Sequence, residues 1–98
     1  MLQEKQSINS VQEAELKKIA CAEDVPLEER LRAVRQIHDS GILLSCVWGS
    51  NDIQVKHAAI ARIDDVKVLR MIQAYDAATR EKIRQRAQYL YRKQGLIT

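Results

Sequence analysis

Apolar residues recur at helical spacing along most of the chain. In one stretch, Leu27, Leu31 and Val34 follow an i, i+4, i+7 order, which places their side chains on one face of an α-helix. The same periodicity predicts helices over about residues 10–22, 26–39, 53–63, 66–75 and 78–94. Three glycines and one proline leave few turn signals, which favours helices over a turn-rich β fold.

The most apolar stretch, Ile42 to Trp48, fits either a buried strand or a buried helix. No other stretch is a strand candidate, and a strand without a partner leaves its backbone groups without hydrogen bonds. We therefore predict a short buried helix here, with Leu43 and Val47 in the core. Trp48 has two interpretations, a core residue or an anchor at an interface, where tryptophan is common.

Polar residues and glycines mark where the helices begin and end. Ser10 and Glu13 have the spacing of a capping box, in which each side chain binds the backbone amide of the other residue. The first helix is therefore predicted from residue 10, with residues 1–9 disordered. Gly41, after Ser40, is predicted as the left-handed C-cap of the second helix. The other predicted caps are Asp64 or Asp65, Asp76 or Thr79, and Gly95.

One sequence pattern occurs twice, at an offset of 26 in the numbering. It consists of a basic residue, an Ala, an aliphatic residue, an Ile, an Asp and an aliphatic pair on the following helix. The matching pairs are Arg30 and Lys56, Ala33 and Ala59, Val34 and Ile60, Ile37 and Ile63, Asp39 and Asp65, Ile42 and Val68, and Leu43 and Leu69. A partial third copy follows at an offset of 28, where Ile83, Arg84, Ala87 and Tyr91 match Val55, Lys56, Ala59 and Ile63. Units that bury only one face are unstable alone, so we expect the copies to stack.

The second copy resembles the short HEAT-like helical repeats of bacterial proteins, whose units read V-R/K-x-x-A-x-x-x-I-x-D-x-x-x-L. Those positions are occupied by Val55, Lys56, Ala59, Ile63, Asp65 and Leu69. The resemblance covers about residues 28–91, and it departs from the family pattern at Gly41 and in the final copy, which has no second helix. It implies an α-solenoid fragment with a binding role and no chemistry.

The expected fold is therefore all-α, with five or six short antiparallel helices stacked as a HEAT-like helical repeat domain. A chain of 98 residues has the size of one domain. Within residues 1–98, the segment 10–22 is expected to be a capping helix, and 26–94 to hold the repeat-like helices.

The sequence also bears on location. The first ten residues are polar and do not fit a signal peptide, and the longest apolar run is too short to span a membrane. Cys21 and Cys46 form no CxxC motif, so we expect reduced, buried thiols. These features predict a cytoplasmic protein without a membrane partner.

Charge is distributed unevenly along the chain. Residues 1–53 carry 6 Lys/Arg against 9 Asp/Glu, whereas residues 54–98 carry 10 against 4. This asymmetry predicts an acidic partner for the C-terminal half. The candidate partner-binding residues on the last helix are Arg80, Lys82, Arg84, Arg86, Tyr89, Arg92 and Lys93, and Trp48 is the candidate outside it.

These residues suit more than one function. The preferred function is a non-enzymatic protein–protein interaction module, with a protein partner or a second copy of the chain. The alternative is a small basic nucleic-acid-binding protein, in which the basic helix contacts phosphates and Tyr89 or Tyr91 stacks on bases. A third option is a structural subunit of a larger assembly.

No pattern in the sequence predicts catalysis, a cofactor or a small-molecule ligand. The soft metal ligands Cys21, His38, Cys46 and His57 lack zinc-site spacing. Adjacent Asp64 and Asp65 direct their side chains apart, whereas a general acid–base pair must face one substrate. Helix capping explains both aspartates, so no enzyme and no metal site are expected.

Overall fold

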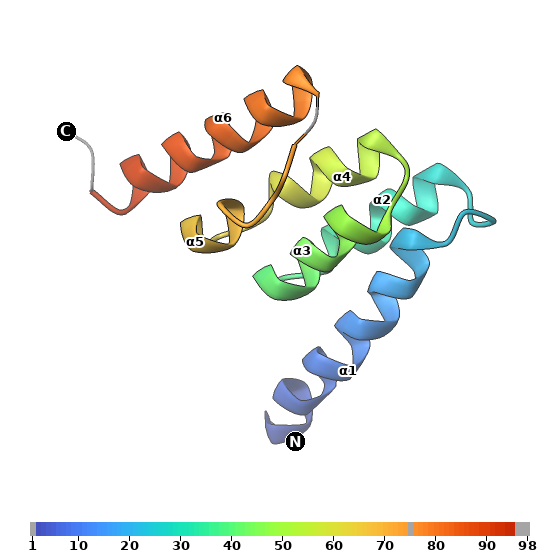
Figure 1. Cartoon of the computed structure of the whole chain (residues 1–98). Helices are drawn as coiled ribbons and strands as arrows, with labels where there is room; N and C mark the ends of the chain where they lie inside the picture. Colours follow the sequence, from blue (N-terminus) through green and yellow to red (C-terminus); the bar gives the residue numbers. More distant parts are fainter. Residues whose placement is uncertain (1, 75, 96–98) are drawn as a thin grey trace.

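A computed structural model describes the backbone of residues 2–74 and 76–95, and the side chains of these residues from position 12 onward. Within these ranges the chain forms six α-helices and no strand (Figure 1). They are α1 (Leu2–Cys21), α2 (Leu27–Arg35), α3 (Ser40–Gly49), α4 (Ile53–Ile60), α5 (Val66–Leu69) and α6 (Ala77–Lys93). The prediction of an all-helical fold is confirmed, and so is the helical interpretation of residues 42–48, which lie in α3.

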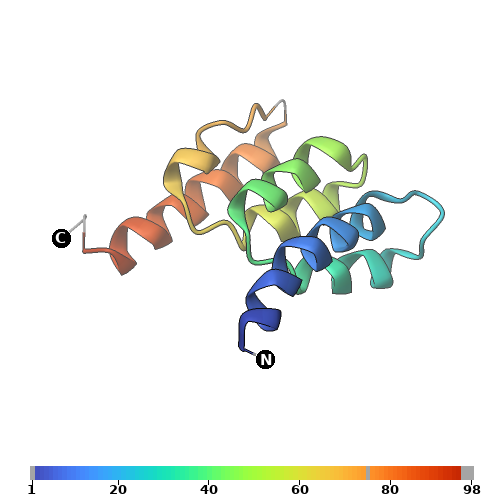
Figure 2. The ribbon, with the colours of Figure 1, turned by 90° about the horizontal axis from the view of Figure 1, so that it is seen from below.

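The helices form two rows. One row contains α1, α3 and α5, and the other contains α2, α4 and α6, with neighbours in each row in contact. Each helix of the first row also packs against the helix that follows it in the sequence (Figures 1 and 2). This arrangement gives a slab of 41 × 34 × 20 Å. Because α3 contacts α1, α4 and α5, it occupies the centre of the fold.

The core consists almost entirely of aliphatic side chains. The largest fully buried ones are Val34, Ile37, Leu43, Cys46, Val55, Ile60, Ile63, Leu69 and Leu90. Burial of each Val, Leu or Ile contributes roughly 1.5–3 kcal/mol. Leu43 and Val47 of α3 are both buried, which confirms their prediction as core residues.

The two copies of the sequence pattern share the same local structure. Asp39 and Asp65, which match in the sequence alignment, are the N-cap residues of α3 and α5, and each carboxylate accepts a hydrogen bond from a backbone amide in the first turn. Their carbonyls also accept from the amides of Leu43 and Leu69, at 2.9 and 3.1 Å. The acidic residue of the pattern is therefore a helix cap, as its position between two helices predicts.

α6, which contains the partial third copy of the pattern, begins earlier than the sequence alignment of that copy indicates. Asp52 caps α4 and Asp76 caps α6, so these structurally equivalent caps are offset by 24 in the numbering, whereas the apolar pattern aligns at 28. The difference is about one helical turn. It arises because α6 is 17 residues long. Successive turns of such a helix carry similar apolar residues, so the pattern can be aligned one turn too late.

The first helix begins at Leu2 rather than at Ser10, so α1 includes positions 2–9, for which we predicted disorder. Helix-forming residues fill this segment, which contains no glycine or proline. Ser10 lies inside α1 and is not its N-cap, so the predicted capping box is wrong. Instead, the buried carboxylate of Glu13 accepts hydrogen bonds from the backbone amides of His38 and Asp39, at 2.9 and 2.8 Å. Glu13 thus attaches α1 to the α2–α3 junction.

Gly41 does not end the second helix. α2 stops at Arg35, and Gly41 lies in the first turn of α3, without a positive φ angle. Asp39 is responsible, because its carboxylate accepts from the amide of Ile42 at 3.0 Å and starts α3 ahead of the glycine. Gly95, predicted as the stop of the last helix, does follow α6, and it adopts the left-handed conformation with φ of 75°.

The fifth helix is much shorter than predicted. α5 ends at Leu69, whereas periodicity extended it to Tyr75, which lies outside the described residues. After α5 the chain leaves the helix, and Ile72 enters the core. Burial of Ile72 and the return of the chain to Asp76 of α6 override helix propensity here, because tertiary contacts outweigh a preference worth only tenths of a kcal/mol per residue.

Candidate functional site

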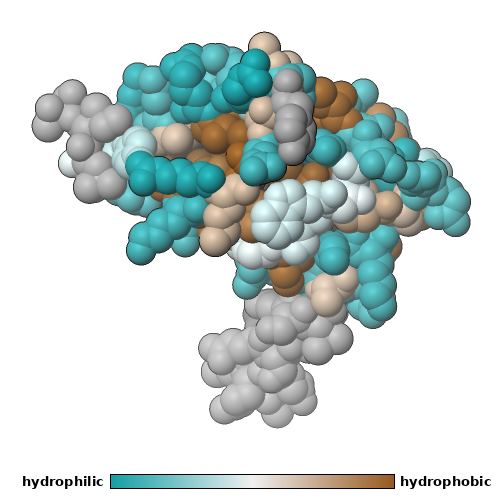
Figure 3. Space-filling model, viewed as in Figure 1, coloured by the Kyte–Doolittle hydropathy of each residue, from teal (hydrophilic) through white to brown (hydrophobic). Residues whose placement is uncertain are grey.

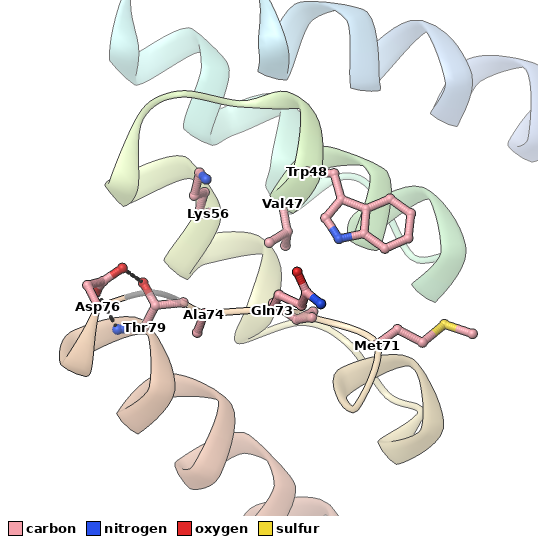
Figure 4. Close-up of a pocket in the computed structure, with 9 residues that line it drawn as sticks. Val47, Trp48, Lys56, Met71, Gln73, Ala74, Asp76 and Thr79 are labelled. Atoms are coloured by element: carbon pink, nitrogen blue, oxygen red, sulfur yellow. Dashed lines mark hydrogen bonds between the residues drawn. The ribbon is translucent and has the colours of Figure 1, made fainter.

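A groove of about 450 Å³ opens between the end of α3 and the segment that joins α5 to α6. Its lining residues are Val47, Trp48, Lys56, Met71, Ile72, Gln73, Ala74, Asp76 and Thr79 (Figure 4). In Figure 3, hydrophobic surface lies in the hollow between the hydrophilic band of α6 and the surface of α3. The groove exists because α5 stops early and the irregular segment after it crosses the end of α3.

Two large apolar side chains at this groove are exposed. Trp48 is 62 % exposed and Met71 is 59 % exposed, whereas Val47 and Ile72 beneath them are buried. Trp48 and Met71 extend in the same direction, with Gln73 between them (Figure 4). Trp48 is therefore a surface residue, so its interpretation as a core residue is wrong, and its role at an interface stays a prediction. Exposed apolar groups over a buried apolar floor are typical of binding surfaces.

The position of Trp48 follows from the composition of α3. Nearly every residue from Ile42 to Trp48 is apolar, so this helix has more apolar side chains than one buried face can hold. Leu43, Leu44 and Val47 occupy the buried face. Trp48 follows Val47 by one residue, about 100° around the helix, and so projects outside the core.

The polar end of the groove is fixed by a chain of hydrogen bonds. The Thr79 hydroxyl donates to Oδ1 of Asp76 at 2.8 Å, and the Thr79 amide donates to Oδ2 at 2.8 Å. Nε2 of His57 lies 3.0 Å from the same hydroxyl. Because the hydroxyl has one proton and gives it to Asp76, His57 must donate from Nε2. The network joins α4 to the start of α6.

This network is structural in character. Thr79 is buried, and its oxygen accepts from His57 rather than giving a proton to it. A nucleophile needs the opposite arrangement, with a base positioned to take the hydroxyl proton. The hydrogen bonds from the Thr79 amide, and next from its hydroxyl, hold the pKa of Asp76 below its usual value of 3.8, so the cap remains ionised at neutral pH.

Lys56 contributes a positive charge to the same groove. It lies on α4 and lines the groove with Trp48. Among the described side chains, no carboxylate forms an ion pair with Lys56. An apolar groove that also presents such a cation favours a ligand with both an apolar group and a negative charge.

The basic residues of α6 do not converge on one surface. At about 100° per residue, Arg80 and Arg84 lie on one flank of the buried stripe, and Lys82, Arg86 and Lys93 lie on the other. Arg92 projects away from the core and is exposed. A shallow pocket of about 190 Å³ collects Lys82, Arg86 and Tyr89 beside α4, and the groove with Trp48 contains none of these residues.

Two of the six basic residues of α6 form ion pairs with acidic residues of the chain. Arg84 forms an ion pair with Glu81, with Nε 3.0 Å from Oε1. Hydrogen bonding from Arg84 lowers the pKa of Glu81, and the same bond raises the pKa of Arg84. Arg86 donates to the carbonyl of Ile63 at 2.8 Å and to Asp64 at 2.9 Å. The free positive charge on α6 is thus smaller than its sequence indicates.

Tyr89 is half exposed on the same flank of α6 as Arg86. The guanidinium of Arg86 lies 4.8 Å from the centre of the Tyr89 ring, and Nζ of Lys93 lies 6.0 Å from it. Both distances fit cation–π contacts. Tyr91, the other stacking candidate, accepts a hydrogen bond from Arg70 at 2.6 Å. The two tyrosines are therefore in contact with cations of the chain itself.

Comparison of the chain with protein-family models, with curated proteins and with solved structures found no match. Among the side chains that the structure describes, no three His, Cys, Asp or Glu residues gather in a way that would hold a metal ion. Within the same part of the chain, no helix is long and apolar enough to cross a membrane.

The sequence predicted Trp48 as a binding residue but did not associate it with Lys56, Met71 and Gln73 of the same groove. Met71 and Gln73 were assigned to a helix, and Lys56 was assigned only to the repeat. Asp76 and Thr79 were alternative predictions for the N-cap of the last helix, and the N-cap is Asp76. A pairing of His57 with Thr79 leaves no signal in one sequence, because the two residues meet only after α4 and α6 pack together.

Proposed function

We propose that the chain is a non-enzymatic protein-interaction module that binds a partner protein in the groove beside Trp48. One observation carries this proposal: Trp48 and Met71 are exposed above a buried apolar floor. Tryptophan in such a position is the residue type most often found at binding hot spots. Burial of both side chains by a partner would remove apolar surface from water, which is the main driving force of association.

The module is proposed to be built from HEAT-like helical repeats. Two rows of helices, in which each helix packs against its row neighbours and against its sequence neighbour, fit the stacking of helix pairs in α-solenoids. The recurrence of the caps Asp39 and Asp65 at the offset of the sequence repeat supports the same proposal. Such stacks commonly present an extended surface to protein partners.

The test uses a photo-crosslinking phenylalanine analogue at position 48 of the full chain in its native cells. Tyr89 provides the matched control, because it is also an exposed aromatic residue but lies on the far flank of α6, outside the groove. We expect position 48 to yield a discrete protein adduct that is absent from position 89. Adding Met71→Ala to the position-48 variant should reduce the adduct, because Met71 forms the same surface.

An adduct at position 89 but not at 48 would show that the basic flank of α6 is the binding surface instead. The absence of any discrete adduct at position 48 would contradict the proposed function. An adduct whose mass is twice that of the chain would identify the partner as a second copy.

The alternative function, nucleic-acid binding by α6, makes a different prediction. It requires affinity for generic DNA or RNA at ~50 mM salt that falls steeply as salt is raised, because the release of counterions from the phosphates drives binding and becomes less favourable at higher salt. The charge-reversed Arg84→Glu, Arg86→Glu variant should then lose that affinity. The intramolecular pairs of Arg84 and Arg86 lead us to expect no such binding, and tight salt-sensitive binding would favour the alternative.

A further inference from the structure

The two cysteines of the chain meet where α1 packs against α3. Cys21 is the last residue of α1, and its thiol lies against Gly49 at the end of α3. A Cβ atom at position 49 would come within 3.2 Å of Sγ of Cys21, which is tighter than an ordinary contact between carbon and sulfur. Gly49 therefore leaves the room that the Cys21 thiol occupies.

Cys46 lies on the same face of α3 as Gly49, one turn earlier in the helix. Residues three apart in an α-helix are surface neighbours, so the Cys21 thiol reaches the face of α3 that carries Cys46. Cys46 is fully buried in the core, and Cys21 packs against that core while remaining partly accessible. The two thiols thus differ in access to solvent but share one contact region.

The electrostatics of Cys46 agree with this placement. Burial is the largest cause that raises the pKa of its thiol to about 12, and the neighbouring Cys21 thiol is the next. Lys17, also on α1, has a smaller opposing effect. Cys46 is therefore protonated at neutral pH and is a poor first target for an oxidant, since the thiolate is the reactive form.

We propose that Cys21 and Cys46 are a modification site that forms a reversible intramolecular disulfide when the protein meets a hydroperoxide. In the first step, the sulfur of Cys21, after losing its proton, attacks the peroxide oxygen and becomes a sulfenic acid, while the alcohol (or water) leaves. In the second step, the sulfur of Cys46 loses its proton and attacks Sγ of Cys21, and the sulfenic hydroxyl leaves as water. Two thiols and one hydroperoxide thus give one disulfide, one alcohol or water, and one further water.

The disulfide would join α1 to α3 and close a loop that contains α2. Cross-linking two segments restricts the unfolded chain more than the folded one. The oxidised protein should therefore melt at a higher temperature than the reduced protein, by roughly 15 °C for a closed loop of this length. The melting temperature should return to that of the reduced protein after treatment with a thiol reductant.

The test treats the folded full-length chain with an equimolar amount of hydrogen peroxide and measures its intact mass. We expect the monomer to lose two hydrogen atoms. Because trypsin cleaves after Lys and Arg, digestion without reductant should then yield the peptide 19–30 linked to the peptide 36–56. Cys46→Ala serves as the matched variant, in which Cys21 should instead retain one added oxygen.

Three results would overturn the proposal. The first is a wild-type chain that gains oxygen atoms at Cys21 without forming the linked peptide. The second is a non-reducing gel that shows only disulfide-linked dimers. The third is a linked peptide that forms while the melting temperature stays unchanged, which would show that the bond does not join structured segments. If Cys46→Ala fails to fold, the mass, the linked peptide and the melting temperature of the wild type still test the proposal.

Discussion

Nε of Arg62 donates a hydrogen bond to the backbone carbonyl of Ile37, 3.0 Å away. Ile37 follows α2, where the last carbonyls of a helix lack partners within the helix. The same contact recurs in the next unit, where Nε of Arg86 donates to the carbonyl of Ile63 at 2.8 Å. Ile37 and Ile63 occupy matching positions of the sequence repeat. In both cases an arginine from the following unit donates a hydrogen bond to the carbonyl at the end of the preceding unit.

Arg62→Ala should destabilise the fold, because the partly buried carbonyl of Ile37 loses its donor. The expected loss in the free energy of unfolding is about 1–2 kcal/mol, the lower part of the range of about 1–3 kcal/mol for an unsatisfied buried group. Urea denaturation of the purified chain measures it. Arg32→Ala is the control, since Arg32 is exposed and should cost less than about 0.5 kcal/mol. Equal losses in both variants would contradict the role of Arg62.

Glu13 should contribute more to stability than Glu15, which is exposed on the same helix. Glu13→Ala leaves the amides of His38 and Asp39 without their acceptor, which should cost about 2–3 kcal/mol. Glu13→Gln keeps an acceptor oxygen and should retain much of that stability. Thermal unfolding of both variants, with exposed Glu15→Ala as the control, measures the difference. A similar melting temperature for Glu13→Ala and Glu15→Ala would refute the attachment of α1 through Glu13.

The caps Asp39 of α3 and Asp65 of α5 should both stabilise the fold, but by different amounts. Replacement of an N-cap aspartate by alanine typically costs about 1 kcal/mol. We expect Asp39→Ala to cost more than Asp65→Ala, because α3 is central to the core, whereas α5 has only four residues. Chemical denaturation of the single and double variants tests this order. The reverse order would show that α5 contributes more to the fold than its length indicates.

The Asp76 cap predicts a specific dependence on pH. Its pKa in the folded protein lies below the usual 3.8, so the ionised cap stabilises the fold above that pH, and the contribution is lost as pH falls through the folded pKa. Asp76→Asn keeps a capping oxygen but cannot titrate. The stability difference between the wild type and Asp76→Asn should be constant well above the usual pKa of 3.8 and should shrink as the pH falls below that value. A difference that does not change in urea titrations across this range would contradict the assignment.

Local signals were sufficient to predict much of the fold. Helical periodicity gave α6 to within one residue at each end and gave the first residue of α4, although α4 ends three residues earlier than predicted. Polar residues between helices marked the cap positions as Asp64 or Asp65 and as Asp76 or Thr79, and the caps are Asp65 and Asp76. The helical interpretation of residues 42–48 succeeded because an unpaired strand would be costly. Each of these arguments depends on residues that are close in sequence.

Contacts between distant residues decided the features that the sequence did not reveal. Glu13 has capping-box spacing with Ser10, but its carboxylate binds amides of the α2–α3 junction instead. α5 ends without a glycine or proline to stop it, because Ile72 enters the core. The groove depends on that early end, so Met71 gave no sign in the sequence that it would lie beside Trp48.

The central claim is that the chain binds a protein through the groove at Trp48. Its most direct test is the dissociation constant of the crosslinked partner, measured by calorimetry for Trp48→Ala and for Tyr89→Ala. We expect Trp48→Ala to raise Kd at least about 30-fold, as loss of a hot-spot residue does, and Tyr89→Ala to change it less than about threefold. An unchanged Kd for Trp48→Ala, or a larger effect of Tyr89→Ala, would contradict the account.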